Sequence, residues 1–393
     1  MRDLVLPELP FRVNGRLVGT PAEIAGRDIS ATIGDSDLEL DLTYRQASVP
    51  DVTFALASKR LDLRPFQGAS APGDARGEPR DIDGDGRLIP DRPLPVAWLS
   101  RANAAADIEI GTLMTRTLEA ANVRLLGRLR DGALRIERLH ADTNRGRIDA
   151  SLTLTPASNA HELQVSLRGE QVKFGSGKEA RNELEMRPKV DLTLELNGRG
   201  DTVRAVAASL DGKLRAQAGE GILPRESNVL ARFFLRDFAS QLIATVNPLT
   251  KHNPDTRLVC AVVLLDVGDG VVSSSPAIVL QTAELNIFAD VRVDLETEAL
   301  NMDVSTRARQ GLGISVGDLV NPFTQVTGTL ASPTISVDTK GALLEGGAAV
   351  ATAGLSFLAK KFRDRFLTAR DPCAKALEAE AEKDQRSRAG AKE

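Results

Sequence analysis

Aromatic residues are scarce in this sequence: they make up 4% of its 393 residues, with one tryptophan and one tyrosine. Its apolar surface must therefore be built mainly from leucine, valine, isoleucine and alanine, without the aromatic anchors of a typical protein-recognition hot spot. An excess of positive charge is also absent, because 50 lysines and arginines stand against 54 acids and give a net charge of −4. Nucleic-acid binding calls for a clustered basic face, so we expect no nucleic-acid partner.

Residues that carry metal or catalytic chemistry are few as well. The two cysteines and three histidines are too few for a zinc cage, and no histidine pair has metal-ligand spacing. The sequence has no G-x-S-x-G nucleophile elbow and no phosphate loop. A segment that begins like a calcium loop, from Asp81 to Gly86, has Arg92 where such a loop ends in glutamate. We therefore expect no metal, no cofactor and no catalytic residue, and we predict that the protein is not an enzyme.

Apolar stretches of about 18 residues, the least that would span a bilayer, are absent too. The amino terminus, MRDLVLPELP, contains acids and prolines where a signal peptide needs an apolar core. The chain as given is therefore expected to be soluble. If the protein works outside the cytoplasm, we expect its targeting segment upstream of this sequence.

Strict alternation of polar and apolar residues is the main structural signal that is present. It is clearest in residues 37–43, 148–155, 190–197 and 291–296. Successive side chains of a β-strand point to opposite faces, so each segment would have one aliphatic and one polar face. Hairpin turns are predicted between such strands at four dipeptides: Asp131-Gly132, Asn197-Gly198, Asp211-Gly212 and Asp269-Gly270.

Other segments divide the chain. Residues 1–66 are β-rich and would continue an upstream region, whereas residues 67–93 are rich in Gly, Pro and Asp and are expected to form a loop. A β-region is predicted over residues 94–373. Within it, an apolar stripe at helical spacing predicts an amphipathic helix near 225–246, and a Gly/Ala-rich segment with a basic end predicts a helix near 341–367.

The predicted fold is mainly β: an elongated, curled antiparallel sheet, groove-like, with a few amphipathic helices near the carboxy terminus. Residues 374–393 are charged and poor in apolar side chains, and they are predicted to form a frayed helix or a disordered tail. A few helices cannot cover ten or more strands, so something else must cover the apolar face. Either the sheet folds shut on itself, or a partner or a lipid covers it.

Two stretches of the carboxy-terminal half resemble the AsmA family of bacterial envelope proteins: residues 260–309, which begin CAVVLLDVGDG, and residues 326–338, VTGTLASPTISVD. The shared pattern is a cysteine, a strand ending in Asp-Gly, a Gly-Thr-x-x-x-Pro turn, a Gly/Ala-rich helix and a final Asp-Pro-Cys element. Upstream, LRGEQVKFG (167–175) and AASLDGKLRAQAGEGIL (207–223) are also similar to the family. The likeness covers residues 50–375.

This resemblance implies a periplasmic protein held in the inner membrane by an amino-terminal anchor, which we expect upstream of this sequence. It also implies a bridge-like lipid transfer protein that guides phospholipids between inner and outer membrane and supports outer-membrane assembly, with envelope assembly proteins as possible further partners. The aliphatic strand faces then become candidates for the lipid track: Leu152, Leu154, Leu192, Leu194, Leu196, Val291, Val293 and Leu295. In an oxidising periplasm, Cys260 and Cys373 are candidates for a disulfide, with two buried thiols as the alternative.

Two other functions fit the same pattern. Alternation also fits an ordinary closed core, so the first alternative is a structural scaffold that binds envelope assembly proteins at its rim. The second is a secreted hydrolase or a carbohydrate-binding β-protein. It would need a convergent Asp/Glu or Ser/His site, and it predicts aromatic sugar platforms that this sequence lacks.

Overall fold

The computed structural model describes residues 9–66, 86–115, 119–143, 146–173, 186–224, 255–283, 285–309, 323–337 and 369–390. Its fold is mainly β, an open, curled sheet of 18 strands with two helices in the described part of the chain. The prediction of a mainly β, curled sheet is therefore confirmed. The chain divides into two compact units, the first with strands β1 to β10 and helix α2, the second with β11 to β18 and helix α6.

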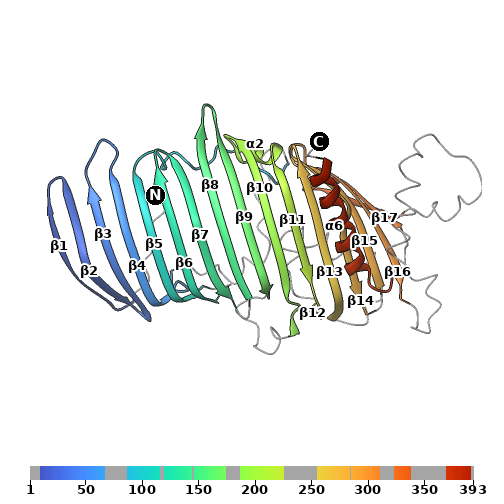
Figure 1. Ribbon diagram of the computed structural model, residues 1–393, viewed down its shortest axis with the longest axis horizontal. Coiled ribbons are helices and arrows are strands. Elements are labelled where there is room, and N and C mark those ends of the chain that lie inside the picture. Colours follow the sequence, from blue (N-terminus) through green and yellow to red (C-terminus); the bar gives the residue numbers. More distant parts are fainter. Residues whose placement is uncertain are drawn as a thin grey trace, which may run out of the picture. The chain divides into compact units, whose positions relative to one another are not determined.

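The first unit is a row of long strands that follow one another in sequence order (Figure 1). Its elements are β1 (Phe11–Thr20), β2 (Glu23–Ile33), β3 (Ser36–Arg45), β4 (Asp51–Asp62), β5 (Asn103–Met114), β6 (Glu119–Arg130), β7 (Ala133–Thr143), β8 (Gly146–Ala157), β9 (Ala160–Val172), β10 (Val190–Gly200) and α2 (Val203–Ala208). The predicted alternating segments 37–43, 148–155 and 190–197 lie within β3, β8 and β10.

One pair of strands departs from the predicted antiparallel sheet. Strands β1 to β4 pair antiparallel, and so do β5 to β9, but β4 and β5 run parallel, with Asp51 opposite Asn103 and Asp62 opposite Met114. Parallel neighbours need a connection that returns to the starting end of the sheet. The chain makes that connection between Asp62 and Asn103. Most of the Gly/Pro/Asp segment predicted as a loop there, residues 67–85, falls outside the described residues.

Two of the four predicted hairpin turns are confirmed. Asp131-Gly132 joins β6 to β7, with φ of 51° and 80°, and Asp269-Gly270 lies between two strands of the second unit, with φ of 47° and 70°. Positive φ at both central residues is the conformation that suits Asp-Gly in a two-residue hairpin.

The other two turn predictions are wrong. Asn197-Gly198 lies inside β10, and Asp211-Gly212 begins the next strand after α2. The glycine at 198 has a packing reason, because a Cβ there would lie 3.0 Å from a Leu210 methyl carbon and 3.1 Å from the Val206 carbonyl oxygen. The close approach of α2 to β10 therefore requires a glycine without any turn.

The second unit consists of β11 (Asp211–Ala218), β12 (Gly221–Pro224), β13 (Asp255–Gly268), β14 (Val271–Thr282), β15 (Leu285–Asp294), β16 (Ala299–Ala308), β17 (Phe323–Thr329), β18 (Pro333–Val337) and α6 (Pro372–Gly390). Strands β12 to β18 pair antiparallel in sequence order. Helix α6, coloured red in Figure 1, lies against β13 and β14. The predicted helices near 225–246 and 341–367 fall outside the described residues.

Residues 374–393 were predicted to form a frayed helix or a disordered tail, and the structure shows the first of these alternatives, a helix that extends as far as Gly390. The helix begins at Pro372, directly after Asp371, whose carboxylate accepts a hydrogen bond of 2.9 Å from the backbone N–H of Ala374. An aspartate cap followed by proline is a favourable helix start. Composition alone left both alternatives open, because the acidic and basic side chains of α6 pair with residues of distant strands.

Candidate functional site

Three rows of apolar side chains cross the first unit from β3 to β9. In each row, every residue is paired with the next one on the adjacent strand. The side chains of two residues paired in this way point to the same side of the sheet. We call this surface the apolar face. Its rows are Leu40, Leu56, Ile108, Leu125, Leu139, Ala150, Leu167; then Leu42, Phe54, Ala106, Gly127, Ile136, Leu152, Val165; and Tyr44, Val52, Ala104, Leu129, Leu134, Leu154, Leu163.

Strand β10 extends the apolar face. Leu192, Leu194 and Leu196 are half-buried and alternate with exposed polar side chains. The position of Leu192 follows from its neighbour in β9, because a Cβ on Gly169 would lie 3.1 Å from the Leu192 Cγ atom. Gly169 is opposite Ile148, which continues the same alternation as Leu152 and Leu154. The leucines predicted in β8 and β10 therefore share one face.

Residues of the apolar face are half-buried rather than buried. Gly127 and Leu129 are buried, and all other members of the three rows have intermediate exposure. A sandwich would bury such a face against a second layer, with contacts between strands far apart in the sheet. Among the described elements of the first unit, the substantial contacts join consecutive strands instead. Within the described residues, a second layer of strands therefore does not cover this face.

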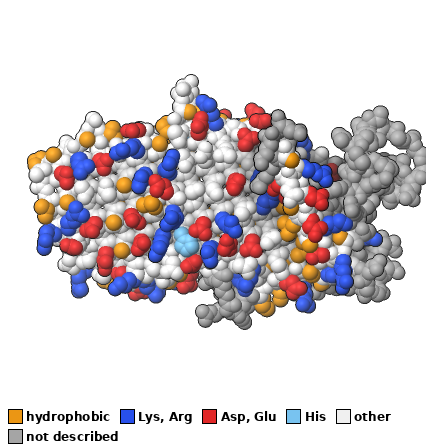
Figure 2. Space-filling model, viewed as in Figure 1, with side chains coloured by type: hydrophobic (Ala, Val, Ile, Leu, Met, Phe, Trp, Pro, Cys, Tyr) orange, Lys and Arg blue, Asp and Glu red, His pale blue; other side chains and the backbone are white. Residues whose placement is uncertain are grey.

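The opposite face of the first unit is polar and exposed to solvent. Exposed ion pairs link neighbouring strands there, such as Arg124 with Glu109 and Arg128 with Glu137, each at 3.6 Å. Figure 2 shows this face, with Lys/Arg and Asp/Glu side chains interspersed over the strands. Exposed pairs of this kind contribute little to stability, so the charges chiefly keep this face hydrated. The first unit is thus an amphipathic sheet with one apolar and one polar face.

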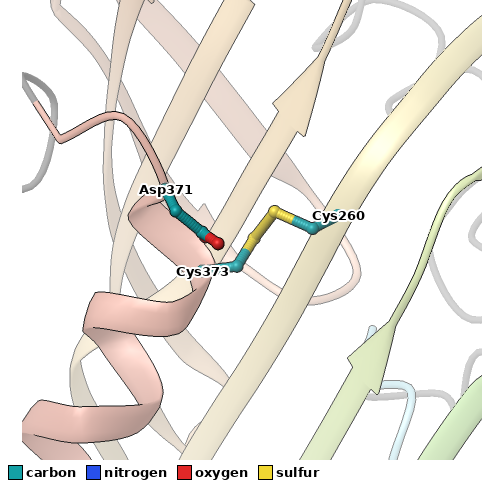
Figure 3. Close-up of side chains that lie close together, drawn as sticks. All are labelled: Cys260, Asp371 and Cys373. Atoms are coloured by element: carbon teal, nitrogen blue, oxygen red, sulfur yellow. A yellow bond between two sulfur atoms is a disulfide. The ribbon is translucent and has the colours of Figure 1, made fainter.

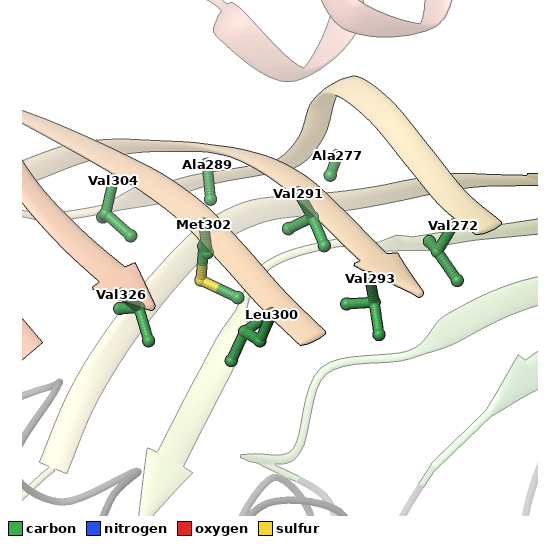
Figure 4. Packing of buried hydrophobic residues seen from close by; sticks show 9 residues of the cluster. All are labelled: Val272, Ala277, Ala289, Val291, Val293, Leu300, Met302, Val304 and Val326. Carbon is green, nitrogen blue, oxygen red and sulfur yellow. The ribbon is translucent and has the colours of Figure 1, made fainter. Parts of the chain in front are cut away.

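The second unit places the remaining predicted candidates in a packed cluster. Val291 and Val293 on β15 are both under 10% exposed, and they pack with valine, leucine and methionine side chains of β14, β16 and β17. In Figure 4 these side chains project to one side of the strands. Leu295 lies just beyond β15 and packs against the same cluster. These three candidates therefore belong to a packed cluster within the second unit, whereas the candidate leucines of the first unit are half-buried.

The sheet of the second unit is apolar on its other face too. Phe288 precedes Ala289 on β15 and therefore points to the opposite side. It packs with Val262, Val279 and two residues of α6, Cys373 and Ala376. Helix α6 thus covers one apolar face of this unit.

The predicted disulfide joins Cys260 of β13 to Cys373 at the start of α6, across a sequence separation of 113 (Figure 3). Asp371 lies beside it, as the cap of the helix. Cys260, Asp371 and Cys373 are also the group of potential metal ligands that the described residues bring together. Both sulfur atoms are used in the disulfide and the carboxylate caps the helix, so the group has a structural explanation.

A cluster of charges holds the second half of α6 on the sheet. Arg215 of β11 donates hydrogen bonds to Asp266 of β13, at 2.8 Å, and to Glu380 of α6. Lys383 of α6 also contacts Asp266, at 2.6 Å. Side chains of Arg215, Asp266 and Glu380 are 19%, 26% and 14% exposed, so water screens their charges only in part. Sequence spacing gives no signal for this cluster, because Arg215 and Glu380 are 165 residues apart.

Two carboxylates in the ion pairs between α6 and the sheet, Asp266 of β13 and Asp384 of α6, have lowered pKa values. Burial acts to raise the pKa of Asp266, but hydrogen bonds from Lys383 and Arg215 and their positive charges outweigh it. For Asp384, the hydrogen bond from Lys213, at 2.5 Å, is the main cause of the lowered pKa. Both carboxylates therefore favour their charged form in the folded protein more than in the unfolded chain.

This lowered pKa predicts a loss of stability in acid. A carboxylate with a depressed folded-state pKa stabilises the fold fully above its unfolded value, near 3.8 here, and loses that contribution as the pH falls through the folded-state pKa. When the pH is lowered below about 4, we expect the melting temperature to decrease. The decrease should be smaller for Asp266→Asn than for the wild type. Thermal unfolding from pH 7 to pH 2.5, followed by circular dichroism, measures this. Parallel curves for the two proteins would contradict it.

Comparison with known proteins returned no match: no family model, no curated protein and no solved structure matches the chain. Among the described residues, no helix is both long and apolar enough to span a bilayer.

Proposed function

We propose that the protein is a non-enzymatic lipid conduit that guides phospholipids along the apolar face of the first unit. The observation that carries this proposal is the continuity of that face: three rows of paired apolar residues cross β3 to β9, and all of them except Gly127 and Leu129 are half-buried. A continuous, smooth, partly accessible apolar surface suits an acyl chain that slides, whereas a catalytic or recognition site needs a few polar groups at fixed positions.

The energetics of lipid transfer support this use. Moving an acyl chain of about 16 carbons into water costs about 12 kcal/mol, at about 0.8 kcal/mol per methylene. A lipid that crosses an aqueous gap therefore needs an apolar track along its whole path. The apolar face contains mainly aliphatic residues and no charged side chain in its three rows. We therefore expect weak selectivity among lipid headgroups.

The cellular setting that we propose rests on the resemblance to the AsmA family. On that reading the protein works in the periplasm, anchored in the inner membrane in its full-length form. It would move phospholipids between inner and outer membrane and support outer-membrane assembly, with envelope assembly proteins as possible partners. The disulfide is consistent with an oxidising compartment.

Bound lipid in the purified chain tests the proposal. We expect phospholipid to co-purify and to be released as an intact ligand in native mass spectrometry. Leu152→Glu places a charge in the middle row of the apolar face and should lower lipid occupancy about tenfold, which corresponds to about 1.4 kcal/mol. Ser151→Glu, one residue earlier on β8 and on the polar face, is the matched control and should leave occupancy unchanged.

The same experiment separates the conduit from a closed scaffold. A scaffold that only binds envelope assembly proteins would carry no lipid, and Leu152→Glu would then affect stability without any lipid-dependent readout. Transfer of fluorescent phospholipid between vesicles gives a second measure. Equal transfer by the Leu152→Glu and Ser151→Glu proteins would rule out the apolar face as the track.

A further inference from the structure

Strand β1 is exposed along its whole length. It pairs on one side with β2, and all ten of its residues are exposed. Its large apolar side chains include Phe11, which is 77% exposed, and Leu17, which is 73% exposed, together with Val13 and Val18. An exposed strand of this length offers a row of backbone N–H and C=O groups to another strand.

Of the features that usually block such pairing, β1 has charged side chains, Arg12 and Arg16, which lie on its polar face. Proline is absent from the strand, and Phe11, Val13 and Leu17 lie on the side of the apolar face. The opposite side carries polar residues and Val18. The register between β1 and β2 shifts once, between Asn14 and Arg16, and the extra residue lies on β2, where Asp28 has a φ of 51°. The bulge therefore leaves β1 itself regular.

β1 also continues the apolar face of the first unit. Phe11 lies opposite Ile33 and Val13 opposite Ala31 on β2, and Ala31 lies opposite Leu38 on β3. A strand that pairs with β1 in the matching register would extend both faces of the sheet, apolar beside apolar and polar beside polar.

We propose that β1 pairs antiparallel with β1 of a second copy of this chain, around a two-fold axis at Gly15. This register places Val13 opposite Leu17 of the other copy and Phe11 opposite Gly19, where the missing side chain leaves room for the ring. On the polar face it places Arg12 opposite Val18 and Asn14 opposite Arg16, so no like charges face each other.

Charge selects this register over its neighbours. A shift by two residues in one direction would place Arg12 opposite Arg16, and a shift in the other direction would place Arg16 opposite Arg16 of the other copy. Like charges directly opposite each other destabilise a strand pair. A shift by one residue would set apolar against polar side chains. Among the described residues β1 is the edge strand, and a strand from an upstream region would compete with the second copy for the same backbone groups. The dimer does not depend on the proposed lipid transport.

Oligomeric state is the first test. The full chain should be a dimer in sedimentation velocity at micromolar concentration. Leu17→Arg should raise the dimer dissociation constant by at least about tenfold, because it puts a charge on the apolar side of the interface. Gln164→Arg, an exposed polar-face position in β9, is the matched control and should leave the dimer intact. A monomeric wild-type protein, or a dimer that Leu17→Arg does not weaken, overturns the proposal.

Cross-linking tests the register without depending on a destabilising variant. Residues opposite each other in an antiparallel pair have Cα atoms about 4.5–5.5 Å apart, within reach of a disulfide. Val13→Cys protein mixed with Leu17→Cys protein should therefore form a mixed disulfide under mild oxidation. Val13→Cys alone should not cross-link, because two copies of this position would lie about 13 Å apart. Efficient cross-linking of Val13→Cys alone, or none in the mixture, overturns the register.

Discussion

Reduction of the disulfide between Cys260 and Cys373 is expected to lower the free energy of unfolding by about 5 kcal/mol. The bridge closes a loop with a sequence separation of 113, and the chain-entropy model gives this magnitude for a loop of about 100 residues. The bridge also fixes the first turn of α6 against β13. Its loss removes the covalent constraint on the helix that covers Phe288 and Val262.

Chemical denaturation with and without reductant measures this effect. The wild type should lose stability in reductant, and its melting temperature should fall by on the order of 10 °C. The Cys260→Ser, Cys373→Ser double variant should be equally destabilised and insensitive to reductant, which makes it the matched control. Limited proteolysis should cut α6 faster in the reduced wild type and in the double variant than in the oxidised wild type. If reductant leaves the wild-type denaturation curve unchanged, the bridge does not stabilise the fold.

Replacement of Arg215 by methionine is expected to cost about 3 kcal/mol. Methionine keeps the apolar stem but leaves Asp266 and Glu380 as two partly buried carboxylates that face each other without their shared cation. Removing one partner of a buried charge cluster is strongly destabilising, because here Glu380 loses the cation of the cluster that it contacts while Asp266 keeps only Lys383. Arg215 also donates a hydrogen bond of 3.0 Å to the Leu265 carbonyl oxygen, which would lose its donor.

Arg386→Met is the matched control for this prediction. Arg386 is on the same helix and pairs with Glu382 at 3.6 Å, but its side chain is 84% exposed, so its loss should change stability by less than about 0.5 kcal/mol. Adding Glu380→Gln to Arg215→Met should recover part of the lost stability, because it removes the repulsion with Asp266. Urea denaturation curves of the four proteins measure these differences. Equal effects of Arg215→Met and Arg386→Met would show that the cluster does not hold α6.

Local patterns were predictable because they depend on neighbouring residues only. The alternation at 148–155 identified β8, and Asp131-Gly132 identified a hairpin, since side-chain direction and positive φ are properties of a few consecutive residues. Asn197-Gly198 was misleading because the same dipeptide also suits a strand under a closely packed helix. The disulfide between Cys260 and Cys373 was one of two alternatives, because the resemblance implied an oxidising periplasm while two buried thiols fitted the sequence as well.

Two features were beyond the reach of sequence patterns. The parallel pairing of β4 with β5 depends on where the connection over residues 63–102 returns to the sheet. The order of the carboxy-terminal helix depends on ion pairs with Arg215 and Lys213, which are distant in sequence. A charged composition leaves disorder open as an alternative when such partners are unknown.

The sequence by itself determined that each strand has one aliphatic face, because alternation fixes the direction of every side chain along a strand. Only the tertiary structure decided what happens to those faces. Leu152 and Val293 lie in equally regular alternating segments, yet Leu152 is half-buried on the apolar face of the first unit and Val293 is buried in a packed cluster of the second. Exposure depends on what packs above a strand, and that is set by contacts between distant segments of the chain.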